Sequence, residues 1–163
     1  MRMISLSVPP GAPGRQPRRE SGYSFPMVRI LAVDFGEKRI GLATSDATET
    51  LATPRLTLRR RSDGAVVDEL DRFCRDEEIG LVVIGIPRSP VDGSESALAG
   101  RIRSFAKKLE AKTALPVRFH EETLTSNEAA RRLPPSSDRE ALDRTAAAIL
   151  LEDYLESRTG EAR

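Results

Sequence analysis

The chain has 163 residues, of which 31% are charged and 39% hydrophobic, as in one ordinary globular domain. No apolar run approaches the roughly 20 residues that span a bilayer, so we expect no membrane segment. The single cysteine, Cys74, excludes an internal disulfide and favours a cytoplasmic protein. The formal net charge of +1 excludes a strongly basic nucleic-acid binder, so any such binding must use local patches.

The first 26 residues differ in composition from the remainder of the chain. They contain the segments PPGAPG and QPRRE, and four arginines against one acid. Such a polar, breaker-rich stretch predicts a disordered N-terminal tail over residues 1–26. We expect the folded domain to cover residues 27–157 and a flexible C-terminus to cover residues 158–163.

The folded part begins with three predicted strands. The apolar run Arg29–Asp34 predicts a buried central strand, and Ile40–Ser45 predicts a second strand that forms a hairpin with it around the turn Gly36–Arg39. A third strand is expected within Ala52–Leu58. Pro54 favours an edge position for it, because proline cannot donate a ladder hydrogen bond.

Helices and strands then alternate. Apolar residues at helical spacing between Val66 and Cys74 predict a helix capped by Ser62 or Asp63, with Cys74 in the core rather than a reactive thiol. The next elements are a buried strand over Leu81–Ile86, a helix containing Leu98, Ile102, Phe105 and Leu109, and a short strand over Pro116–His120.

Two capping-box patterns predict the last helices. Thr125 with Glu128 opens a short helix that ends before Pro134, and Ser137 with Glu140 opens a longer one to about Leu155. We expect its apolar stripe to contain Leu142, Ala146, Ile149 and Leu150. The whole order predicts an α/β fold with a mixed five-stranded sheet, an antiparallel meander followed by parallel strands, flanked by helices.

Three acids stand where a carboxylate is costly. Asp34 ends the buried first strand, Glu122 follows the last strand, and Asp143 borders the apolar stripe of the final helix. Each has a simpler interpretation: a turn cap through Gly36, a solvated strand end, or an acid favouring the helix dipole. Strand phase also leaves the choice between Glu121 and Glu122 open.

If these acids converge, they predict a metal site. Clustered carboxylates repel one another unless a cation neutralises them, and Mg²⁺ or Mn²⁺ prefers oxygen ligands. Carboxylates that hold such ions suit phosphodiester hydrolysis. We interpret the only histidine, His120, as an exposed strand-end residue, and a general-base role for it as a minor hypothesis.

Four segments together resemble a known family. The resemblance is carried by VDFGEKRIGLATSD (33–46), GIPRSPVDGSES (85–96), EETLTSNEA (121–129) and LDRTAAAILLEDYL (142–155). In this order and spacing they resemble the YqgF family, whose members are described as Holliday-junction resolvases and as pre-16S rRNA nucleases. The resemblance covers essentially Val28 to Leu155.

The resemblance implies an RNase H-like fold, similar to RuvC-type resolvases, and metal-dependent phosphodiester cleavage in the 5′ maturation of 16S rRNA. It carries over Asp34, Glu122 and Asp143 as catalytic metal ligands, and it is the resemblance that selects Glu122. Structured RNA, branched DNA and ribosomal particles are the expected partners, for a monomer or a homodimer.

The same segments supply candidate nucleic-acid contacts. Lys38 and Arg39 follow Asp34, and Arg88 and Ser94 lie in the loop after the fourth strand, where a helix start could hold phosphate. Thr125 and Ser126 complete this set. The alternatives are a resolvase of branched DNA, a non-catalytic nucleic-acid or ribosome-binding module and, least favoured, half of an actin-like ATPase or sugar kinase.

Overall fold

The computed structural model describes residues 28–88, 96–122, 125–134 and 136–161. The predicted tail over residues 1–26 lies outside this part of the chain, as does Ser94. No described helix is both long and apolar enough to cross a membrane.

The described chain forms one five-stranded mixed sheet with the order β3-β2-β1-β4-β5. β2 pairs antiparallel with both β1 and β3, whereas β4 pairs parallel with both β1 and β5. The predicted hairpin, the central first strand and the edge strand with Pro54 are all confirmed. The strands are β1 (Arg29–Phe35), β2 (Arg39–Ser45), β3 (Ala52–Arg59), β4 (Ile79–Pro87) and β5 (Val117–Glu122).

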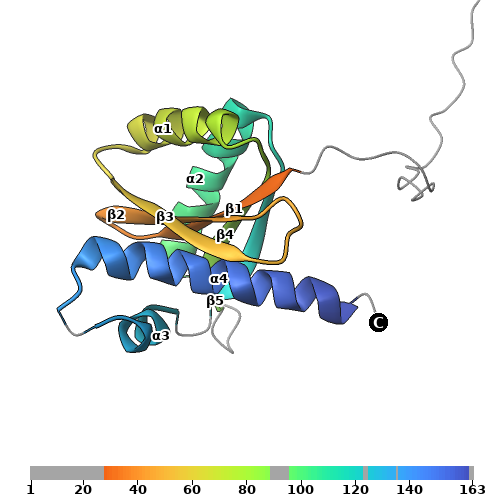
Figure 1. Ribbon diagram of the computed structural model, residues 1–163. Coiled ribbons are helices and arrows are strands. Elements are labelled where there is room, and N and C mark those ends of the chain that lie inside the picture. Colours follow the sequence, from red (N-terminus) through yellow and green to blue (C-terminus); the bar gives the residue numbers. More distant parts are fainter. Residues whose placement is uncertain (1–27, 89–95, 123–124, 135, 162–163) are drawn as a thin grey trace, which may run out of the picture.

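Helices cover both faces of the sheet. The helices are α1 (Asp63–Asp76), α2 (Ala97–Thr113), α3 (Thr125–Arg132) and α4 (Arg139–Glu161). α1 and α2 lie side by side on one face, α4 runs across the other face, and α3 packs on α4 (Figure 1). The predicted α/β architecture is therefore confirmed.

β1 is buried on both sides, which explains its unbroken apolar run. Leu31 and Val33 join the cluster beneath α1 and α2, whereas Ile30 and Ala32 join the cluster beneath α4. Because side chains alternate along a strand, Asp34 belongs to the α4 face. A carboxylate therefore ends the α4-facing row of the most buried strand.

α4 buries two neighbouring faces rather than one stripe. Ala147 and Leu151 pack on the sheet, whereas Ala146 and Ile149 pack with Ala129 of α3. The predicted stripe mixed these two surfaces, because periodicity alone cannot show that a helix has two partners. Asp143 precedes Ala147 by one turn and therefore stands at the start of the sheet-facing row.

Both ends of α4 differ from the prediction. Asp138, not Ser137, caps the first turn by accepting a hydrogen bond from the Ala141 N–H at 2.7 Å. The helix continues past Leu155 to Glu161, so residues 158–161 are helical rather than a flexible C-terminus. An ion pair of 2.6 Å between Arg158 and Glu49 of the β2–β3 loop supports this last turn.

Cys74 lies on the buried face of α1 and belongs to the core, as predicted. Burial, together with nearby Asp71, raises the pKa of the Cys74 thiol to about 11. A thiol that stays protonated at neutral pH is a poor nucleophile, so Cys74 is a packing residue.

Candidate active site

The candidate site lies at one edge of the sheet. β1, β4 and β5 are parallel, so their carboxyl ends meet at this edge, where the clefts of α/β sheets usually form. Asp34 is the penultimate residue of β1, and Glu122 is the last residue of β5, in register with Pro87. β2 begins at the same edge with Arg39, which pairs with Arg59 at the end of β3.

Asp34 is half-buried at the carboxyl end of β1. In the antiparallel ladder it pairs with Gly41, and directly opposed residues share one face of the sheet. The turn that follows is closed by its own backbone, since the Gly36 N–H donates to the Arg39 carbonyl at 3.0 Å. The Gly36 N–H, the donor that a turn cap by Asp34 would use, is therefore already bound to a backbone carbonyl.

Gly41 lets α4 approach this end of β2. A Cβ atom added at Gly41 would lie 2.0 Å from the carbonyl oxygen of Asp143, so any side chain there would push the helix away. The backbone of Asp143 therefore rests on the residue that pairs with Asp34. Sequence reasoning missed Gly41, although a glycine inside an apolar strand is a known indication of close backbone approach.

Arg39 binds Asp143 directly. The Arg39 Nε donates to Asp143 Oδ2 at 2.5 Å, and about a quarter of the Asp143 side chain is exposed. Arg39 was predicted to contact nucleic acid, but here it neutralises a candidate metal ligand. Asp143 thus already holds a cation, and a second cation would compete with the guanidinium group.

The backbone of Glu122 is placed at the carboxyl edge, but its side chain lies outside the description, as do those of Thr125 and Ser126. Its neighbour Glu121 is exposed and forms an ion pair of 3.1 Å with Arg88. Arg88, a predicted nucleic-acid contact, therefore stands at the end of β4 with an exposed partner. Such exposed pairs contribute little to stability and exchange readily for other ligands.

His120 is not the exposed residue that we expected. Its side chain is only 18% exposed, its Nε2 lies 2.6 Å from Asp153 Oδ2, and its ring meets Tyr154 edge-on. Both partners belong to α4. His120 therefore joins β5 to α4, and these contacts support a structural role.

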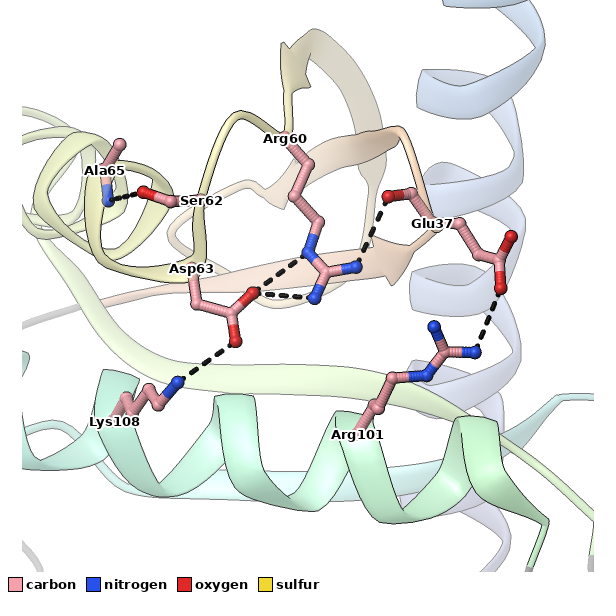
Figure 2. Close-up of polar contacts among 7 residues, drawn as sticks. All are labelled: Glu37, Arg60, Ser62, Asp63, Ala65, Arg101 and Lys108. Carbon is pink, nitrogen blue, oxygen red and sulfur yellow. Dashed lines mark hydrogen bonds and ion pairs between the residues drawn. The ribbon is translucent and has the colours of Figure 1, made fainter.

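A polar network holds the turn that follows Asp34. Arg60 donates two hydrogen bonds to Asp63 and one to the carbonyl of Glu37, and its guanidinium lies 4.5 Å from the centre of the Phe35 ring (Figure 2). From α2, Lys108 binds Asp63 and Arg101 binds Glu37. Arg60 was not singled out from the sequence, because its contacts with Glu37 and Phe35 join it to a segment distant in the chain.

The described residues suit a hard divalent cation only in part. Asp34 and Asp143 each supply a carboxylate, the donor type that Mg²⁺ and Mn²⁺ prefer, and the backbone of Asp143 lies on Gly41, the register partner of Asp34. Among the side chains that the structure places, no three His, Cys, Asp or Glu gather as a metal site. The Glu122 side chain is outside that set, so the predicted cluster of three acids stays a prediction.

The chain matches known proteins over most of its length. The model of the RuvX family, described as Holliday junction resolvase, matches residues 28–157. The chain belongs to this family. A "Putative pre-16S rRNA nuclease" of Rippkaea orientalis is 35% identical over 136 residues, which cover 80% of this chain and 97% of that protein. A protein of the same name from Maridesulfovibrio salexigens is 36% identical over 133 residues, or 78% and 98%.

Solved structures agree on the fold of this RuvX-family chain. Thermus thermophilus RuvC in complex with a Holliday junction substrate has a TM-score of 0.54 at 12% identity, covering 82% of this chain and 96% of that one. The yeast mitochondrial Holliday junction resolvase has a TM-score of 0.52 at 10% identity, covering 83% and 80%. At these identities the likeness shows the RNase H-like fold and no more.

Proposed function

We propose that the protein is a metal-dependent endonuclease that hydrolyses phosphodiester bonds in the 5′ maturation of pre-16S rRNA. The observation that carries the proposal is the placement of Asp143 on Gly41, the register partner of Asp34, at the edge where β5 ends in Glu122. The choice of RNA as the substrate rests on relatives at 35–36% identity, which are named "Putative pre-16S rRNA nuclease".

In this proposal Asp34, Glu122 and Asp143 hold the Mg²⁺ or Mn²⁺, which when bound would activate water and stabilise the leaving oxygen. The fold contributes rigidity. Asp34 is fixed by a central strand, and Asp143 by a helix that Gly41 and Arg39 hold against the sheet. Preorganised carboxylates need little rearrangement when the scissile phosphate arrives.

The test compares wild type with Asp34→Asn, which keeps the shape of the side chain but removes its charge. Both proteins are given a labelled precursor RNA containing the 5′ leader of 16S rRNA, with Mn²⁺ or Mg²⁺. We expect wild type to cut the leader and the variant to lose at least a hundredfold in rate, because a metal ligand acts in the transition state. Asp68→Asn, an exposed acid on α1, is the matched control and should cut like wild type.

A four-way DNA junction forms the second arm, because the family is described by Holliday junction resolution. If wild type cut the junction in preference to the RNA, branched DNA and not precursor RNA would be the substrate. Equal cleavage by wild type and Asp34→Asn would contradict the site. Failure of wild type to cut either substrate would favour a nucleic-acid or ribosome-binding module. The RNA substrate would place the protein in the cytoplasm, on ribosomal precursor particles.

A further inference from the structure

A basic hollow of about 780 Å³ opens beside the candidate site. Its volume falls within the ~300–1,000 Å³ of typical small-molecule pockets. It is lined by six basic side chains, a strong local concentration in a chain whose net charge is only +1. These are Lys38, Arg39, Arg59, Arg60, Arg61 and Arg139.

The six cations differ in whether an acidic side chain of the described structure already binds them. Arg39 is bound to Asp143, and Arg60, only 16% exposed, is held by Asp63. Arg59 is 80% exposed, and its nearest partner, Glu140, is 3.9 Å away. The side chains of Lys38, Arg61 and Arg139 are exposed and have no described partner. Half of the charge around the hollow is therefore free to bind an anion.

The two acids of the hollow leave it positively charged, because six cations minus two acids give a formal charge of +4. Asp138 is used as the cap of α4, and Glu140 has only the distant contact with Arg59. The carbonyl of Glu140 accepts a hydrogen bond of 2.8 Å from the Thr57 hydroxyl. This contact ties the start of α4 to β3 and fixes the shape of the hollow.

The hollow adjoins the acids directly. Arg39 lines it and also binds Asp143, and Arg139 stands one helical turn before Asp143 on α4. Lys38 belongs to the turn after Asp34. Arg59 is the last residue of β3, and Arg61 lies just beyond it at the same sheet edge. A chain of phosphates that entered the hollow would thus continue onto Asp143 and Asp34.

We infer that this hollow binds the phosphodiester backbone of the substrate strand on one side of the bond that is cut. The inference rests on the proposed nuclease function and adds a binding surface to it. Arginine matches phosphate oxygens with paired hydrogen bonds, and the described lining residues include no aromatic side chain on which a base could stack. The hollow therefore recognises backbone charge rather than base identity.

The experiment removes two free cations and measures binding rather than cleavage. A labelled RNA hairpin with a single-stranded 5′ extension is titrated by fluorescence anisotropy, without divalent ions, over a series of salt concentrations. Arg61→Gln with Arg139→Gln should weaken binding about tenfold at low salt. A plot of log affinity against log salt concentration has a negative slope, and the magnitude of that slope should decrease by about two.

The matched control is Arg72→Gln with Lys107→Gln. These two cations are also exposed and form no ion pair within 4 Å in the described structure, but they belong to α1 and α2, on the face of the sheet opposite α4, and do not line the hollow. The control carries the same change in net charge and should bind within twofold of wild type. Equal losses in the two double variants would overturn the inference, because only overall charge would then matter.

Two further arms separate this inference from the proposed function. Asp34→Asn should bind the hairpin as wild type does while losing cleavage. If Asp34→Asn behaves in this way and the Arg61→Gln/Arg139→Gln variant also binds the hairpin like wild type, the binding role of the hollow is contradicted. The proposed nuclease function is not. The titration is repeated with a four-way DNA junction. A similar loss on RNA and DNA supports backbone binding, and a loss confined to one of them contradicts it.

Discussion

At the scale of the residue, the ion pair between Arg39 and Asp143 governs the candidate site. The pair joins the first residue of β2 to α4, and both side chains are mostly shielded from water. A carboxylate that binds a guanidinium at 2.5 Å cannot offer the same oxygen to a metal without displacing it. Arg39 therefore competes with the proposed metal for Asp143.

Arg39→Gln should raise the affinity for Mn²⁺ about fivefold, because a partly exposed ion pair contributes up to about 1 kcal/mol. Isothermal titration calorimetry at constant ionic strength measures the Mn²⁺ affinity in the absence of nucleic acid. Arg29→Gln breaks a comparable pair with Glu77 at the opposite end of β1 and should leave Mn²⁺ binding unchanged. Unchanged or weaker Mn²⁺ binding by the Arg39 variant would show that the guanidinium does not compete.

At the scale of the element, the approach of α4 to β2 decides where Asp143 stands. The helix backbone rests on Gly41, a contact distance that only glycine permits. Farther along α4, the side chains of Ala147 and Leu151 also pack on the sheet. The helix is therefore held at both its backbone and its side chains.

Gly41→Ala should destabilise the fold by roughly 1–3 kcal/mol, because the added methyl overlaps the Asp143 carbonyl and α4 must shift. Urea denaturation followed by circular dichroism measures the loss. Gly64→Ala on α1, where a Cβ meets nothing within 4 Å, should instead be neutral or stabilising by up to about 1 kcal/mol. Equal stability of the two variants would show that α4 tolerates a greater distance from the sheet.

At the scale of the whole molecule, charged side chains tie the layers together around the turn after β1. Asp63 at the start of α1 binds Arg60 after β3 and Lys108 of α2, and Glu37 of the turn binds Arg101 (Figure 2). Burial alone would raise the pKa of Asp63. Hydrogen bonds from Arg60 and Lys108 outweigh it and hold the pKa below its ordinary value.

A lowered pKa gives stability that depends on pH in a defined direction. The contribution of ionised Asp63 to the free energy of unfolding is complete above the unfolded-state pKa of about 3.9. This contribution is lost as the pH falls through the lower folded-state pKa. Asp63→Asn should therefore cost about 1–2 kcal/mol at pH 7. The difference from wild type should shrink below about pH 4.

Urea titrations at pH 7, 5 and 3.5 measure this difference. Glu69→Gln changes an exposed acid on the same helix and should have little effect at any of these values. A difference between Asp63→Asn and wild type that stays constant down to pH 3.5 would exclude the ionised carboxylate as its source.

The sequence by itself determined the elements and their kinds, because hydrophobic periodicity and capping patterns are local properties of the chain. It also predicted the family, which the match over residues 28–157 confirms, and three acidic metal ligands, which stay a prediction. The predicted single stripe on α4 was wrong, since it depends on what packs against the helix. The predicted cap at Ser137 was wrong by one residue, because the adjacent Asp138 is an equally good capping residue and takes the position.

Only the tertiary structure decided which of these residues meet. Arg39 and Asp143 are 104 residues apart in the chain, and no local pattern relates them. Their contact follows from strand register and from the distance at which α4 crosses Gly41, and both are set by packing between distant segments. For the same physical reason, six basic residues from three separate segments form one hollow beside the candidate site, although only Lys38 and Arg39 were predicted from the sequence as nucleic-acid contacts.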